Sequence, residues 1–103
     1  PKDRPWRLPV IALGEFLFGV RQSRDRTRLE GWLGEVVEVI DLVGVDAGTA
    51  DHYADIREEL RRAATPIPEN DIWIAASCRQ HGLAIASRDT HLDKVKGLRR
   101  IAW

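Results

Sequence analysis

Residues 66–76 read Pro-Ile-Pro-Glu-Asn-Asp-Ile-Trp-Ile-Ala-Ala, and this stretch does most to decide the fold. The two prolines end the preceding element, because proline lacks a backbone N–H and fixes its own backbone angle. Asn70 offers a side-chain oxygen as the cap of a helix over residues 71–81, and Gly82 suits the left-handed residue that follows a helix. Residues 72–76 are all apolar, so this helix is expected to pack on more than one side.

Strand-like and helical patterns alternate on both sides of this helix. Short apolar runs typical of strands cover residues 8–13, 37–43, 83–86 and 98–103. Helical periodicity covers residues 14–20, a second helix that Ser23 can cap, and a third that begins at Asp46 or Thr49. This alternation predicts an α/β fold with a mostly parallel sheet, and the length of 103 residues predicts a single domain over residues 1–103.

Composition excludes several classes of protein. The 16 Lys+Arg balance 16 Asp+Glu, which argues against an arm that binds nucleic acid through positive charge alone. A hydrophobic content of 44% and a charged content of 31% are typical of a folded domain. No apolar run approaches the roughly 20 residues of a membrane span. A single cysteine, Cys78, excludes internal disulfides and a cysteine-rich zinc site, which favours a reducing cytoplasm.

Three acidic residues stand at places where parallel α/β proteins build sites. Glu15 follows a strand-like run and opens a helix, Asp71 opens the apolar helix, and Asp89 follows residues 83–86. The carboxyl ends of parallel strands meet at one edge of the sheet, and ligands bind in the crevice there. Glu15 and Asp89 are expected at this edge, and Asp71 joins them if its helix begins there.

Clustered carboxylates repel one another and need a cation to be stable at neutral pH. Oxygen ligands without a histidine or cysteine cluster favour Mg²⁺ or Mn²⁺, and hydrolysis of a phosphodiester is the natural reaction of such a site. A structural role is open for each acid. Glu15 and Asp71 can complement a helix dipole, and Asp89 can serve a turn or a cap.

Residues 12–19, 66–76 and 87–98, taken together and in this order, resemble the PIN domain, and specifically the VapC-type toxins of bacterial toxin–antitoxin pairs. The resemblance implies a three-layer α/β/α fold and an endoribonuclease that depends on Mg²⁺ or Mn²⁺. Glu15, Asp71 and Asp89 fall on the second, third and fourth acids of the family and would be its catalytic metal ligands. Asp93 is either an accessory ligand or a surface acid.

The resemblance also implies partners and exposes one departure from the family. The expected partners are an RNA substrate, a VapB-like antitoxin and a second copy of the toxin, all in the cytoplasm and without a membrane. The family begins with an apolar strand that carries the first acid and lies in the middle of the sheet, between the strands that correspond to residues 8–13 and 83–86. Nothing before Leu8 matches it. Either the strand lies outside this chain, or another chain supplies it, or the protein is an inactive module that binds a protein or RNA partner.

Overall fold

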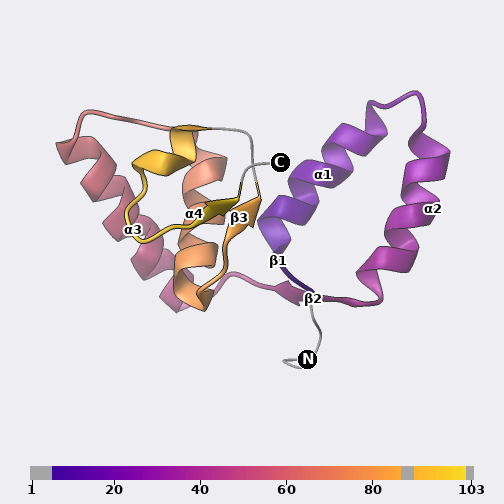
Figure 1. The fold of residues 1–103 in the computed structure, drawn as a ribbon, viewed down its shortest axis with the longest axis horizontal. Coiled ribbons are helices and arrows are strands. Elements are labelled where there is room, and N and C mark those ends of the chain that lie inside the picture. Colours follow the sequence, from indigo (N-terminus) through magenta and orange to yellow (C-terminus); the bar gives the residue numbers. More distant parts are fainter. Residues whose placement is uncertain (1–5, 87–89, 102–103) are drawn as a thin grey trace. The chain divides into compact units, whose positions relative to one another are not determined.

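The computed structural model describes residues 6–86 and 90–101 (Figure 1). The elements in chain order are β1 (Trp6–Pro9), α1 (Val10–Arg21), α2 (Arg26–Val37), β2 (Ile40–Val43), α3 (Ala47–Arg62), α4 (Glu69–His81), β3 (Ile85–Ala86), a 3₁₀ helix (Thr90–Lys94) and β4 (Arg100–Ile101). The chain divides into two compact units, Pro1–Gly44 and Val45–Trp103, which we describe separately. None of the described helices is long and apolar enough to cross a membrane. That residues 1–103 form one domain stays a prediction.

In the first unit, β1 and β2 pair in parallel, from Trp6 opposite Ile40 to Pro9 opposite Val43. The expected strand over residues 8–13 is wrong beyond Pro9, because Val10 already begins α1. The reason is periodicity, since Leu13, Leu17 and Val20 recur at helical spacing and Val20 is buried.

The boundary between α2 and β2 also differs from the expectation. The β-branched run over residues 37–43 predicts a strand, but α2 continues through Val37 and β2 begins at Ile40. The predicted cap of α2 is wrong as well. The residue that precedes α2 is Asp25, and the Ser23 hydroxyl instead accepts a hydrogen bond from the Asp25 N–H at 3.1 Å.

In the second unit, α3 begins as the sequence predicts. The Asp46 carboxylate accepts the Thr49 N–H at 3.1 Å, and the Thr49 hydroxyl accepts the Asp46 N–H at 3.1 Å. This reciprocal pair satisfies two backbone donors that the first turn of a helix leaves unpaired. Gln80 of α4 donates a further hydrogen bond to the Asp46 carboxylate at 2.8 Å, which ties the start of α3 to the end of α4.

Helix α4 packs on several sides, as its consecutive apolar residues predict. It begins at Glu69 with Pro68 as its N-cap, so the expected cap at Asn70 is wrong, while Gly82 ends the helix with φ of 66° as expected. The core of the unit gathers side chains from α3, α4, the turn between them and the 3₁₀ segment: Ile56, Leu60, Ile67, Ile72, Ala75, Ala76, Leu92 and Val95.

The described strands form two separate parallel pairs, β1 with β2 and β3 with β4. In the second pair, Ile85 lies opposite Arg100 and Ala86 opposite Ile101. The α/β class and the parallel pairing are therefore confirmed. Among the described residues, no strand pairs with a strand of the other unit.

Arg79 joins three segments of the second unit. Its guanidinium donates to both carboxylate oxygens of Glu59, at 3.0 and 3.1 Å, and to the backbone carbonyl of Lys96. The hydrogen bond from Arg79 holds the pKa of the Glu59 carboxyl below its usual range. Helix α3, helix α4 and the chain after the 3₁₀ helix are thus held by one half-buried cation.

Replacing the anion of this contact should weaken the fold in a pH-dependent way. Glu59→Gln is expected to lower the free energy of unfolding at pH 7 by roughly 0.5–1 kcal/mol, because the carboxylate is partly exposed and water screens the pair. A pKa lowered by folding adds stability above the unfolded pKa, about 4.3, and that stability fades as the pH falls through the folded pKa. Chemical denaturation between pH 3 and pH 7 should show the two proteins converging at low pH. Glu35→Gln on α2 is the control, and a difference that is constant with pH would contradict the assignment.

Ala64 offers a second test of the fold. It follows α3 with φ of 55°, a left-handed conformation that a β-carbon disfavours. The Thr65 N–H closes the helix end on the Leu60 carbonyl at 3.0 Å. Ala64→Gly should therefore stabilise the protein by about 0.5–1 kcal/mol, whereas Ala54→Gly within α3 should destabilise it by about 1 kcal/mol. Thermal melting measures both, and a lower melting temperature for Ala64→Gly would refute the argument.

Candidate functional site

Asp71 lies in the first turn of α4, as the sequence predicts, and its side chain is half-buried. The Pro68 carbonyl accepts the backbone N–H of Asp71 at 3.0 Å, which forms the first bond of the helix. Ile67 and Ile72 are buried in the core on either side. The backbone that carries this carboxylate is therefore fixed by apolar packing before and after it.

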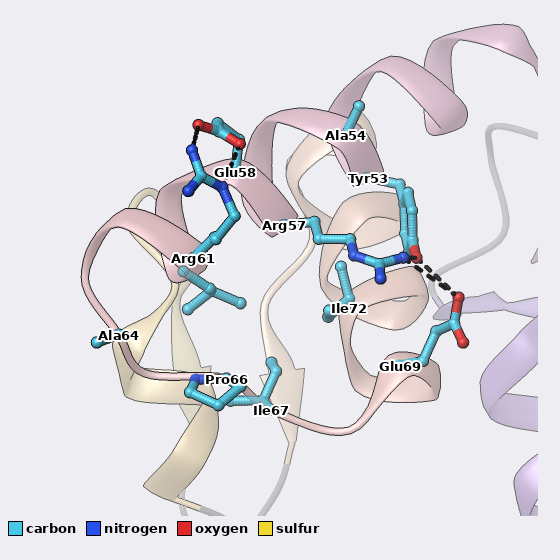
Figure 2. A pocket seen from close by; sticks show the side chains of 11 residues that line it. Tyr53, Ala54, Arg57, Glu58, Arg61, Ala64, Pro66, Ile67, Glu69 and Ile72 are labelled. Carbon is cyan, nitrogen blue, oxygen red and sulfur yellow. Dashed lines mark hydrogen bonds and ion pairs between the residues drawn. The ribbon is translucent and has the colours of Figure 1, made fainter.

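An aromatic pair also holds the start of α4 against α3. The rings of Tyr53 and Trp73 stack with centroids 4.0 Å apart and planes 16° apart. The Tyr53 hydroxyl donates to the Glu69 carboxylate at 2.8 Å and accepts a hydrogen bond from Arg57 at 2.6 Å (Figure 2). Trp73 is half-buried, and one face of its indole is covered by this stack.

A pocket of about 680 Å³ lies between α3, the turn after it and the start of α4 (Figure 2). Its apolar lining includes Pro66 and Ile67. Charged side chains at its edge are paired, and hydrogen bonds from Arg61 and then Arg62 lower the pKa of Glu58 to about 2. Asp71 is not among its lining residues. The pocket is therefore distinct from the side chain of Asp71.

Glu15 lies in the second turn of α1, with its side chain exposed. β1 leads directly into α1, so the acid follows a parallel strand as predicted. The prediction that Glu15 opens the helix is wrong, because α1 already begins at Val10. Its neighbour Gly14, and Gly19 one turn later, each have open space where a β-carbon would be. Gly14, Glu15 and Gly19 are all exposed on α1.

Asp89 lies outside the described residues. Within residues 6–86 and 90–101, no group of three or more His, Cys, Asp or Glu side chains is close enough to hold a metal ion. Glu15 and Asp71 belong to different units, so the convergence of the three acids stays a prediction. Their carboxylate oxygens are the ligand type that Mg²⁺ and Mn²⁺ prefer, so the chemistry of the donors fits either ion.

Asp93 has a partner that the sequence analysis missed. Arg100 donates to its two carboxylate oxygens at 2.6 and 3.0 Å, and this hydrogen bonding lowers the pKa of Asp93. Of the two roles left open for this acid, the geometry favours a structural ion pair near the surface. Seven residues separate the partners along the chain, and Arg100 lies in β4, opposite Ile85 of β3.

The PIN domain family model matches residues 2–98. The chain belongs to the PIN domain family. This PIN domain is 33% identical over 94 residues to the tRNA(fMet)-specific endonuclease VapC of Shigella flexneri, covering 90% of the chain and 71% of that protein. It is 31% identical over 86 residues to ribonuclease VapC4 of Mycobacterium tuberculosis, covering 82% of the chain and 66% of that protein. The chain thus spans about two thirds of the length of these curated relatives, and the resemblance to VapC proteins is confirmed.

Solved structures agree with this assignment. The PIN domain aligns with a DNA-bound VapBC structure from Salmonella typhimurium at a TM-score of 0.81 and 24% identity, covering 94% of the chain and 74% of that chain. It aligns with FitAcB from Neisseria gonorrhoeae at a TM-score of 0.81 and 25% identity, covering 92% of this chain and 73% of the FitAcB chain. These similarities confirm the PIN fold.

Substitution by asparagine should affect Mn²⁺ binding differently at Asp89 and at Asp93. Asp93→Asn removes an ion-pair partner of Arg100 and is expected to lower the melting temperature slightly, while Mn²⁺ binding measured by calorimetry stays within about twofold of the wild type. Asp89→Asn is the matched comparison, four residues earlier. Loss of Mn²⁺ binding in Asp93→Asn with an unchanged melting temperature would restore the role of accessory ligand.

Proposed function

We propose that the protein is a metal-dependent endoribonuclease and the toxin of a type II toxin–antitoxin pair. The observation that supports this most is the 33% identity, over 90% of the chain, to an endonuclease named for its tRNA substrate. A second VapC ribonuclease matches at 31% identity over 82% of the chain. The substrate class is RNA, and the reaction is hydrolysis of a phosphodiester bond.

Glu15, Asp71 and Asp89 would hold Mg²⁺ or Mn²⁺. The family's first strand, to which no part of this sequence corresponds, would supply a fourth acid. When bound, the ion supplies Lewis-acid chemistry, lowering the pKa of water and neutralising charge on the phosphate. The part that this chain's residues play is positioning. The buried Ile67 and Ile72 hold the backbone of Asp71, and α1 carries Glu15 with its side chain exposed.

The partners follow from the same family. A VapB-like antitoxin would cover the site, and a second copy of the toxin would complete a homodimer. Structural relatives described as VapBC complexes support an antitoxin partner. The cytoplasm, where RNA is found and the free Cys78 stays reduced, is the proposed compartment.

A second function is supported by the sequence of the first described strand. β1 reads Trp-Arg-Leu-Pro and carries no acidic residue, unlike the acid-bearing first strand that the resemblance implies for the family. Without that acid, the protein would keep the surfaces of the fold and bind a protein or RNA partner without cleaving RNA.

Substitution of the proposed ligands decides between these functions. Asp71→Asn and Glu15→Gln should each reduce Mn²⁺-dependent cleavage of RNA on the order of 100-fold or more, because each removes a charge that stabilises the bound ion. Glu69→Gln is the matched control, since it lies in the same turn as Asp71 and bonds Tyr53 instead. Cleavage followed on gels and Mn²⁺ binding followed by calorimetry should fall together.

Two results would contradict these assignments. A folded wild-type protein that binds RNA but neither binds Mn²⁺ nor cleaves RNA would establish the inactive module. Equal activity of Asp71→Asn and Glu69→Gln would show that Asp71 is a helix-dipole residue only.

A further inference from the structure

Phe18 is an exposed aromatic side chain beside a proposed ligand. It is 65% exposed, the largest value for any big apolar side chain in the described part of the protein. It follows Glu15 by three residues within α1, so the two side chains share one face of the helix, about 4.5 Å apart along its axis. The most exposed ring of the described chain therefore stands one helical turn from a carboxylate of the proposed site.

The surroundings of Phe18 are small or polar. Gly14 and Gly19 flank the face, and beyond their chain neighbours and the helix's own backbone neither has a heavy atom within 4 Å of where its β-carbon would lie. Gln22, one turn further along, is exposed. Protein partners are usually recognised through contiguous apolar patches. A lone ring between glycines instead leaves a flat, open surface of the size of one base.

Arg21 adds a positive charge on the same side. It is exposed and follows Phe18 by three residues, and one of its guanidinium nitrogens donates to the Leu17 carbonyl at 3.2 Å. This bond holds the guanidinium at the end of α1, within reach of a nucleic-acid strand that lies along the helix. An aromatic ring next to an arginine is the combination with which proteins bind single-stranded nucleic acid, because the ring stacks on a base and the cation meets the phosphate.

The second exposed aromatic group of the unit differs from Phe18. Phe16 and Trp32 contact each other across α1 and α2, with ring centroids 6.1 Å apart. Phe16 lies about 160° around the helix from Phe18. Its ring is engaged with a neighbour, so it offers a control of the same chemistry on the same helix.

We propose that Phe18 is a base-stacking residue that positions single-stranded RNA beside Glu15. The inference rests on the proposed ribonuclease function. One base of the substrate stacks on the Phe18 ring, Arg21 meets the adjoining phosphate, and the neighbouring phosphodiester is placed next to the Glu15 carboxylate.

Fluorescence of 2-aminopurine tests stacking without any cleavage. Mixed-sequence single-stranded RNA oligonucleotides carry one 2-aminopurine and are titrated with the full protein in EDTA, since stacking on an aromatic ring quenches the probe. Phe18→Leu should abolish the quenching and weaken binding about 5- to 100-fold. Phe18→Tyr should retain both, and Phe16→Leu should leave quenching unchanged. Melting temperatures are measured for every variant.

The outcomes separate this inference from the function on which it rests. Quenching and affinity that are unchanged in Phe18→Leu overturn it, even if Mn²⁺-dependent cleavage is intact. A large fall in the melting temperature of both Phe18→Leu and Phe18→Tyr would show that Phe18 is a packing residue. Loss of antitoxin binding with unchanged RNA binding would show that Phe18 contacts a protein. Either result overturns the inference. Wild-type protein that quenches the probe but never cleaves RNA refutes the ribonuclease function while leaving the stacking role supported.

Discussion

The second unit depends on the close approach of α3 and α4. Ala75 and Ala76 are 0% exposed, and their small side chains let the backbone of α4 come near to Ile56 and Leu60 of α3. Larger residues there would separate the helices and open voids that cost stability. Because the helices are locked along this line, the first turn of α4 has little freedom, and the position of Asp71 is set by packing that takes no part in chemistry.

Arg79 extends this constraint to the segment that follows Asp89. Leu92 and Val95 are each 3% exposed, so the 3₁₀ segment is anchored in the core by apolar contacts. The guanidinium then fixes the chain just beyond it through the Lys96 carbonyl. A planar fork of donors can meet both oxygens of Glu59 and a third acceptor at once, whereas the point charge of a lysine could not hold this geometry. The end of the described chain is thus held by both packing and charge.

The sequence predicted those helix ends that are set by a single residue acting on its own stretch of backbone. Asp46 caps α3 and Gly82 ends α4, because a side-chain oxygen and a residue without a β-carbon act on their own backbone. The boundary after Pro9 was missed, since a short apolar run is compatible with a strand or with a buried helix until its tertiary neighbours are known. Asn70 failed as a cap for a related reason: Pro68 already supplies the turn, and the carbonyl of Pro68 accepts the first helical bonds.

The site was predictable only residue by residue. The sequence pattern predicted that Asp71 opens a helix, which is confirmed, and that Glu15 opens one, which is wrong because Glu15 lies in the second turn of α1. Similarity to VapC proteins identified the family, but neither the pattern nor the similarity fixes how distant acids meet. Two acids of the second unit serve the fold. Asp93 and Glu59 each accept hydrogen bonds from an arginine on both carboxylate oxygens, and these bonds lower the pKa of each carboxyl. A carboxylate whose charge is already balanced gains less from a divalent ion than one in a repelling cluster, so Asp93 and Glu59 are weaker candidates for metal ligands.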